Sequence, residues 1–198
     1  TIPQLIKLIK AEKKLVCPTN DAYLLQYLRA RKFNPKKAFS LMQNYHQVKK
    51  SYRDIYDTYD PEVIDRVLAS KAAFSLPYRD EDGCAILIIR MGRWDPDVFT
   101  VSEAISVLTL IVLYCIEDPA TEVCGIRIVL DVQGASLKQV RCLTPRYIHL
   151  FSRALRNCLP ARFKGIHIYN ESTIFQYIWS VLKLLLSEKI KKSGTFPR

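Results

Sequence analysis

Residues 125–132 read Gly-Ile-Arg-Ile-Val-Leu-Asp-Val, and this β-branched run predicts a strand. An earlier continuous apolar run, Ala-Ile-Leu-Ile-Ile at 85–89, is typical of a strand that is buried on both faces. Residues 166–169, Ile-His-Ile-Tyr, predict a third strand. An apolar helical pattern follows each strand, beginning near residues 101, 145 and 174. This alternation predicts an α/β fold in which helices pack against a largely parallel sheet.

Before residue 70 the sequence shows only helical patterns. Asn34-Pro35 is an N-cap residue followed by proline at the first helical position, and apolar residues recur at spacings of three and four after it. Asp60-Pro61 repeats the same signature. We therefore expect an all-α N-terminal module of three to four helices over residues 1–70, followed by the α/β domain.

Composition limits the classes of partner. The chain has 198 residues with 30 Lys and Arg against 19 Asp and Glu, a net charge of +11 that favours nucleic acid, acidic membrane surfaces or phosphorylated small molecules. The longest apolar run, residues 104–116, covers 13 residues, whereas a bilayer span requires roughly 18 or more. Neither a transmembrane helix nor a signal peptide is expected. Six scattered cysteines without a Cys-x-x-Cys pair predict free thiols in a reducing, cytoplasmic compartment.

Motifs of common catalytic sites are missing from the sequence. There is no Gly-x-Gly-x-x-Gly, no phosphate-binding Gly-x-x-x-x-Gly-Lys and no Gly-x-Ser-x-Gly. His46, His149 and His167 fall on separate elements without the spacing of metal ligands. We therefore expect no enzymatic activity, no cofactor and no metal site.

Two other features point to lipid. Residues 174–186 predict a helix that is apolar on nearly all sides, which is typical of a helix that is buried, covers an apolar molecule or meets a membrane. Simple burial in the core explains that pattern equally well. Basic residues gather at the ends of elements, and if these ends converge they form a pocket for phosphate groups.

The sequence resembles the CRAL-TRIO lipid-binding family at several separated motifs. Residues 27–34, Tyr-Leu-Arg-Ala-Arg-Lys-Phe-Asn, are similar to the small helical domain that precedes CRAL-TRIO domains. Residues 128–134 resemble the central strand of the lipid-binding domain, and Leu-Pro-Ala-Arg-Phe-Lys-Gly-Ile-His at 159–167 matches in order and spacing. Within the family, the resemblance is to the group of retinaldehyde-binding, alpha-tocopherol-transfer and clavesin proteins.

This resemblance implies a cytoplasmic carrier that encloses one hydrophobic molecule, such as a retinoid or tocopherol, beneath a mobile gate helix. The positions that match the gate helix are Phe175, Tyr177, Ile178, Val181, Leu182 and Leu185. A basic cleft for phosphoinositide headgroups is implied at Arg31, Arg162, Lys164 and Lys189. A fifth basic position of the family falls on the uncharged Ser193.

The chain departs from the family pattern near its end. Residues 183–186 read Lys-Leu-Leu-Leu where the family usually has Lys-Pro-Phe-Leu, so a proline kink is missing. The resemblance ends at about Lys192, and a final segment of about 50 residues, on the scale of the family's domain, is absent. The lipid-binding domain is thus expected over 71–192, truncated at its C-terminus, with a divergent tail at 193–198.

We expect lipid binding and transfer between membranes by a monomer that visits endosomal or other intracellular membranes transiently. A nucleic-acid-binding protein is the alternative that charge alone suggests, but aromatic residues do not alternate clearly with the basic ones, so no nucleic acid is expected. A lipid sensor or scaffold that does not transfer its ligand is a third possibility.

Overall fold

The computed structural model describes residues 1–57, 59–170 and 176. Its N-terminal part consists of helices, two of which, α3 and α5, begin at predicted caps. The bounds are α1 (Ile2–Ala11), α2 (Asp21–Ala30), α3 (Pro35–Ser51), α4 (Arg53–Tyr56) and α5 (Pro61–Ser70). Asn34 Oδ1 accepts a hydrogen bond from Lys37 N at 3.0 Å, and Asp60 Oδ1 accepts one from Glu62 N at 2.9 Å. Both predicted caps are therefore confirmed.

The remaining described elements are strands, helices and short helical turns. They are β1 (Ala73–Arg79), β2 (Ala85–Arg90), the 3-10 turn η1 (Met91–Arg93), α6 (Val101–Cys115), α7 (Pro119–Cys124), β3 (Ile126–Asp131), α8 (Leu137–Cys142), α9 (Pro145–Arg153), η2 (Ala154–Cys158) and β4 (Phe163–Tyr169). The three predicted strands are confirmed as β2, β3 and β4. Strand β1 and the short helices α7 and α8 are additions that the sequence patterns did not indicate.

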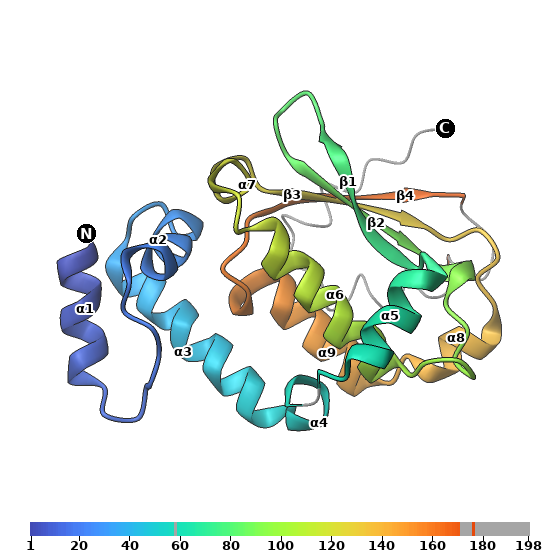
Figure 1. The fold of residues 1–198 in the computed structure, drawn as a ribbon, viewed down its shortest axis with the longest axis horizontal. Coiled ribbons are helices and arrows are strands. Elements are labelled where there is room, and N and C mark those ends of the chain that lie inside the picture. Colours follow the sequence, from blue (N-terminus) through green and yellow to red (C-terminus); the bar gives the residue numbers. More distant parts are fainter. Residues whose placement is uncertain (58, 171–175, 177–198) are drawn as a thin grey trace.

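The sheet has the order β1-β2-β3-β4 and is mostly parallel. Strands β2, β3 and β4 run parallel, with Ala85 opposite Ile126 and Ile128 opposite Ile166, whereas β1 pairs antiparallel with β2. Figure 1 shows α5, α6 and α9 beneath one face of this sheet and α1–α3 beyond its end. The predicted fold class, a helical N-terminal part followed by a mixed α/β part with a largely parallel sheet, is confirmed.

Each of these parts has an apolar cluster of its own. Ile126, Ile128 and Ile166 on the sheet pack with Val112 and Ile116 of α6 and its C-terminal end. A separate cluster joins α1, α2 and α3 through side chains that include Leu5, Leu24, Leu28, Leu41 and Met42. We call α1–α3 the helical module.

Two further features of the described residues are the state of the cysteines and the length of the helices. All six cysteines lie in the described part of the chain and are free thiols. No helix among the described residues is both long enough and apolar enough to cross a membrane.

Candidate functional site

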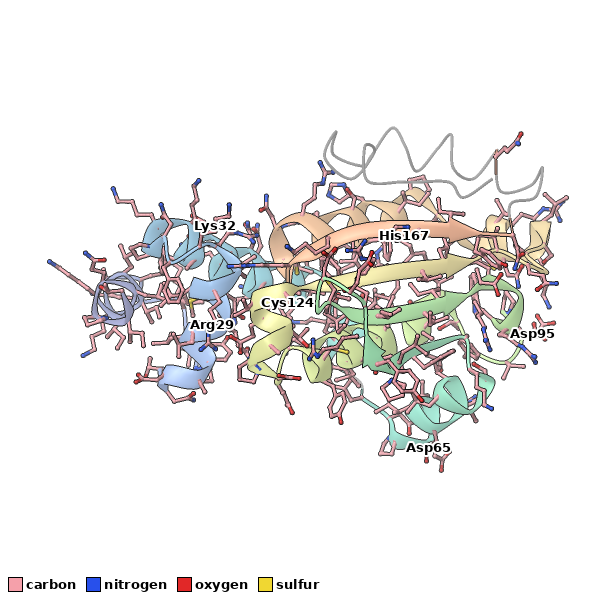
Figure 2. All side chains as sticks on the ribbon, turned by 90° about the horizontal axis from the view of Figure 1, so that it is seen from above. Arg29, Lys32, Asp65, Asp95, Cys124 and His167 are labelled. Carbon is pink, nitrogen blue, oxygen red and sulfur yellow. The ribbon has the colours of Figure 1, made fainter. Side chains whose placement is uncertain are left out.

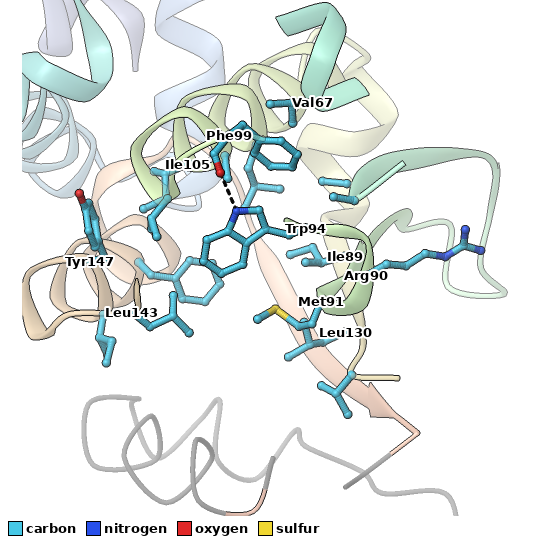
Figure 3. A pocket seen from close by; sticks show the side chains of 18 residues that line it. Val67, Ile89, Arg90, Met91, Trp94, Phe99, Ile105, Leu130, Leu143 and Tyr147 are labelled. Atoms are coloured by element: carbon cyan, nitrogen blue, oxygen red, sulfur yellow. Dashed lines mark hydrogen bonds between the residues drawn. The ribbon is translucent and has the colours of Figure 1, made fainter. Parts of the chain in front are cut away.

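An apolar cavity of about 170 Å³ lies where the parallel strands β2 and β3 end. The helices α5, α6 and α9 and the turn η1 complete its wall (Figure 3). The lining residues are Val67, Ala72, Ala73, Ile89, Arg90, Met91, Trp94, Phe99, Val101, Ala104, Ile105, Leu108, Leu130, Val132, Leu143, Tyr147, Ile148 and Phe151. Open α/β sheets commonly bind their ligands at the carboxyl ends of their strands, so the position itself favours a binding site.

The polar groups of this wall are already engaged. Trp94 Nε1 donates to the Phe99 carbonyl oxygen at 2.9 Å, which leaves the hydrocarbon surface of the indole for the cavity (Figure 3). The hydroxyl groups of Tyr147 and Ser102 are 2.9 Å apart. The Arg90 guanidinium lies over the Phe74 ring at 5.1 Å and points away from the cavity in Figure 3. Within the described wall, a bound molecule would therefore meet almost only carbon.

Gln139 fixes the turn that carries Trp94. Its amide Nε2 donates to the carbonyl oxygens of Met91 at 2.9 Å and Trp94 at 2.7 Å, and the residue is buried. Buried carbonyl groups need such partners, because an unsatisfied one costs roughly 1–3 kcal/mol. The cavity wall is thus held in place by a side chain from α8 that does not itself line the cavity.

Helix α6 is apolar on two faces because it separates two hollows. Ala104, Ile105 and Leu108 face the cavity. Leu110 and Tyr114 instead line a more open groove of about 330 Å³ between α5, β1 and α6. A helix that is apolar all round is usually a fully buried core helix, whereas here the second face borders a groove at the surface.

The wall has a direct physical consequence. An apolar wall favours apolar guests over water, because water would find no hydrogen-bond partners along it. A hydrocarbon group that leaves water for such a space gains roughly 25 cal/mol per Å² of apolar surface. The arrangement can therefore hold an apolar molecule, or the apolar part of a larger one. No cluster of three or more potential metal ligands occurs in the described ranges.

Arg31 and Arg162, two residues of the predicted basic cleft, both lie at the C-terminal end of α2. Arg31 Nη2 donates to the Arg156 carbonyl oxygen at 3.0 Å and to Asn157 Oδ1 at 3.2 Å, and burial lowers the pKa of its guanidinium. Arg162 donates to the carbonyl oxygens of Val123, at 3.0 Å, and Arg29. Each guanidinium has five N–H donors, so these hydrogen bonds do not use all of them.

Lys164 occupies a β-bulge at the start of β4. Phe163 pairs with Ile126 and Gly165 with Arg127, which leaves Lys164 as the extra residue. A bulge turns a side chain away from its regular direction, and Lys164 is exposed there. The structure thus brings Arg31 and Arg162 to one junction and places exposed Lys164 two residues after Arg162.

An ion pair crosses the same junction. Arg29 Nη1 lies 2.6 Å from Glu122 Oε2, and the Glu122 side chain is only 6% exposed. This pair joins α2 to α7, and Figure 2 shows Arg29 and Cys124 at the boundary between the helical module and the sheet. Sequence patterns do not pair Glu122 with Arg29, because the two residues lie 93 positions apart.

The other predicted site residues lie outside the described residues. These are Lys189 of the basic cleft and Phe175, Tyr177, Ile178, Val181, Leu182 and Leu185 of the gate helix.

Part of the cavity wall could be predicted from the sequence. The spacing of Ile148, Phe151 and Leu155 after Thr144-Pro145 predicts that all three face inward. Ile148 and Phe151 line the cavity, and Leu155 is buried in the core. The sequence pattern did not indicate that Trp94 and Leu108 line the cavity. The apolar character of α6 on several sides was a usable signal, but it does not show which face borders empty space.

Comparison with known proteins agrees with this geometry. The sequence profile of the CRAL/TRIO domain family matches residues 69–196, and that of the CRAL/TRIO N-terminal domain matches residues 5–44. The chain is 35% identical over 171 residues to a Homo sapiens protein named alpha-tocopherol transfer protein-like, covering 86% of this chain and 50% of that protein. It is 31% identical over 177 residues to clavesin-2 of Mus musculus, covering 88% of this chain and 54% of that one.

The chain therefore spans about half the length of the curated relatives it matches. Among solved structures, the crystal structure of Sfh5 superposes with a TM-score of 0.58 and 13% identity, over 98% of this chain and 75% of that one. At this identity the likeness shows a shared fold.

Proposed function

Because the chain belongs to the CRAL/TRIO family, we propose that it binds a hydrophobic small lipid in the apolar cavity and transfers it between membranes. The observation that carries this proposal is the cavity of about 170 Å³, in whose wall the polar groups of Trp94 and Tyr147 already have partners. The proposed ligand class is a retinoid, tocopherol or similar lipid, and the name of one relative, alpha-tocopherol transfer protein-like, supports the tocopherol.

The proposal includes the apolar segment 174–186 as the cover of the cavity. Its residues Phe175, Tyr177, Ile178, Val181, Leu182 and Leu185 supply an apolar surface of the kind that can both close over a lipid and enter a bilayer interface. The mechanism is physical: burial of apolar surface holds the lipid, and contact with a membrane releases it.

The test is organic extraction of the purified chain followed by mass spectrometry and a vesicle-to-vesicle transfer assay with the extracted lipid. A single class of hydrophobic lipid that moves between vesicles supports the proposal. Extracts without lipid, together with no uptake of retinoid or tocopherol, would overturn it. Lipid that is bound but is not transferred between vesicles would contradict a carrier and favour a lipid sensor or scaffold.

The basic cleft is proposed to hold a phosphoinositide headgroup at Arg31, Arg162, Lys164 and Lys189. Lys164 offers the sharpest test. Arg31 and Arg162 also donate hydrogen bonds to backbone carbonyl oxygens, so their variants would disturb packing as well. We expect Lys164→Glu to weaken binding to phosphoinositide vesicles by about tenfold or more, since one cation contributes on the order of 1 kcal/mol and reversal adds repulsion.

The matched control is Lys7→Glu, which makes the same charge change at an exposed position on α1. Equal effects of the two variants would reduce the role of Lys164 to its contribution to net charge and would contradict a cleft.

A further inference from the structure

The turn between α2 and α3 combines an exposed aromatic side chain with exposed cations. Phe33 is 55% exposed, and Lys32, Lys36 and Lys37 around it are exposed as well. We call Lys32, Phe33, Lys36 and Lys37 the α2–α3 tip; Figure 2 shows Lys32 at the surface of the helical module. From this combination we propose that the tip is a membrane-contact site, at which Phe33 enters the interface of an anionic bilayer.

The backbone holds Phe33 in place. Lys32 and Phe33 have φ values of 51° and 58°, a left-handed conformation that is uncommon for a bulky residue. Phe33 N donates to the Leu28 carbonyl oxygen at 2.7 Å, and Asn34 N donates to that of Arg31 at 3.1 Å. The exposure of Phe33 therefore belongs to a fixed turn that is hydrogen-bonded to the end of α2.

The charges of this surface are unbalanced. No Asp or Glu occurs between Asp21 and Asp54. None of the ion pairs of the described residues involves Lys32, Lys36 or Lys37. The positive charge of the tip therefore remains available to an anionic partner, whereas Arg29 one turn earlier is neutralised by Glu122.

An anionic bilayer fits both properties. Its surface attracts lysines by about 1 kcal/mol each, and aromatic rings settle at the level of the headgroups. Single-stranded nucleic acid also combines phosphates with flat bases, but its binding surfaces stack successive bases on several aromatic residues. At the tip one exposed phenyl ring stands among three lysines, which favours the membrane.

This inference rests on the proposed function, because a carrier that exchanges lipid must meet membranes. It adds a contact on the helical module, made by residues that neither line the cavity nor belong to the segment 174–186. With two contacts, binding to the surface and exchange of the ligand become separable steps.

The experiment measures co-sedimentation of the full chain with vesicles of phosphatidylcholine, with and without phosphatidylserine and without phosphoinositide. We expect Phe33→Ala to weaken binding to the phosphatidylserine vesicles by about tenfold, the effect of withdrawing part of a phenyl ring from an apolar environment. Phe33→Leu should restore most of the binding, and Tyr78→Ala, which removes another exposed aromatic ring on β1, should leave it unchanged.

A charge-matched comparison isolates the lysines. Lys32→Gln, Lys36→Gln and Lys37→Gln together should weaken binding by at least about tenfold. Lys7→Gln, Lys10→Gln and Lys14→Gln together remove the same charge from exposed positions on and after α1 and should weaken it much less. Equal losses in the two triple variants would overturn the site.

Two other results would also overturn the proposal. One is wild-type vesicle binding by Phe33→Ala with an unchanged circular dichroism spectrum. The other is a loss of affinity for single-stranded oligonucleotide in Phe33→Ala while vesicle binding stays intact. Failure of the proposed function alone gives a different result from failure of the tip. In that case extracts of the chain contain no lipid, whereas vesicle binding still depends on Phe33.

Discussion

Glu122 shows how one buried side chain can decide the join between two parts of the molecule. Its carboxylate is 6% exposed and lies 2.6 Å from the Arg29 guanidinium. A charge removed from water is stable only with a close partner, so loss of either member leaves the other uncompensated. The Arg29–Glu122 pair therefore contributes to the position of α2 against α7, and with it to the geometry of Arg31 and Arg162.

We expect Glu122→Gln to lower the free energy of unfolding by roughly 1–3 kcal/mol, because the Arg29 charge would lose its partner. The loss stays within this range because the Arg29 side chain is 26% exposed and water still solvates part of its charge. Urea unfolding followed by circular dichroism measures the change. Asp57→Asn is the control, since its pair with Arg53 spans 3.8 Å and both side chains are more than half exposed. That variant should differ from wild type by less than about 1 kcal/mol, and equal effects of the two variants would contradict this view of Glu122.

At the scale of elements, Arg146 links α9, which lines the cavity, to α4. Arg146 Nη2 lies 2.7 Å from Asp54 Oδ1, and its guanidinium lies over the rings of Tyr52 at 5.1 Å and Tyr147 at 5.7 Å. The hydrogen bond from Arg146 lowers the pKa of the Asp54 carboxyl below its usual value. A depressed carboxyl pKa stabilises the fold above the ordinary pKa of aspartate, and that contribution disappears as the pH falls through the folded-state pKa.

Asp54→Asn should therefore be less stable than wild type near pH 7, and the difference should shrink as the pH falls below about 4. Urea midpoints at neutral and acidic pH test this. Asp65→Asn makes the same charge change at an exposed position on α5 and should show no such pH dependence. A difference between Asp54→Asn and wild type that is constant with pH would exclude the Asp54–Arg146 pair as its source.

The elements differ in how far they could be predicted. Strands β2 and β3 were predictable because strands buried on both faces need largely apolar, β-branched runs, and β4 was predictable from Ile-His-Ile-Tyr at 166–169. Strand β1 was not, because an antiparallel edge strand tolerates Ser75 and Pro77 and needs no such run. The sequence pattern places the end of the helix that begins near residue 101 at about Asp118-Pro119, whereas Asp118 Oδ1 caps a further helix, α7, through Ala120 N at 2.8 Å. Its signature is the one that correctly located the starts of α3 and α5.

At the scale of the whole molecule, the cavity comes from segments far apart in the chain. Its wall runs from Val67 on α5 to Phe151 on α9 and includes the ends of β2 and β3. Periodicity predicts which side of a helix is apolar, but whether that side meets a neighbour or a void depends on how several elements pack together. The fold class could therefore be predicted from the sequence, and the family resemblance implied a cavity, whereas the place of the cavity in the fold and most of its lining residues could not be predicted.

The two faces of α6 allow a direct test of the cavity as the lipid site. Leu108→Trp places a larger side chain in the cavity, and Leu110→Trp makes the same substitution on the same helix toward the outer groove. The measurement is the molar ratio of extracted lipid to folded protein for wild type and both variants. We predict that Leu108→Trp lowers this ratio by about tenfold or more, which corresponds to a loss of at least about 1.4 kcal/mol in binding, whereas Leu110→Trp keeps the wild-type ratio. Equal lipid content in all three proteins would contradict the assignment of the cavity as the binding site.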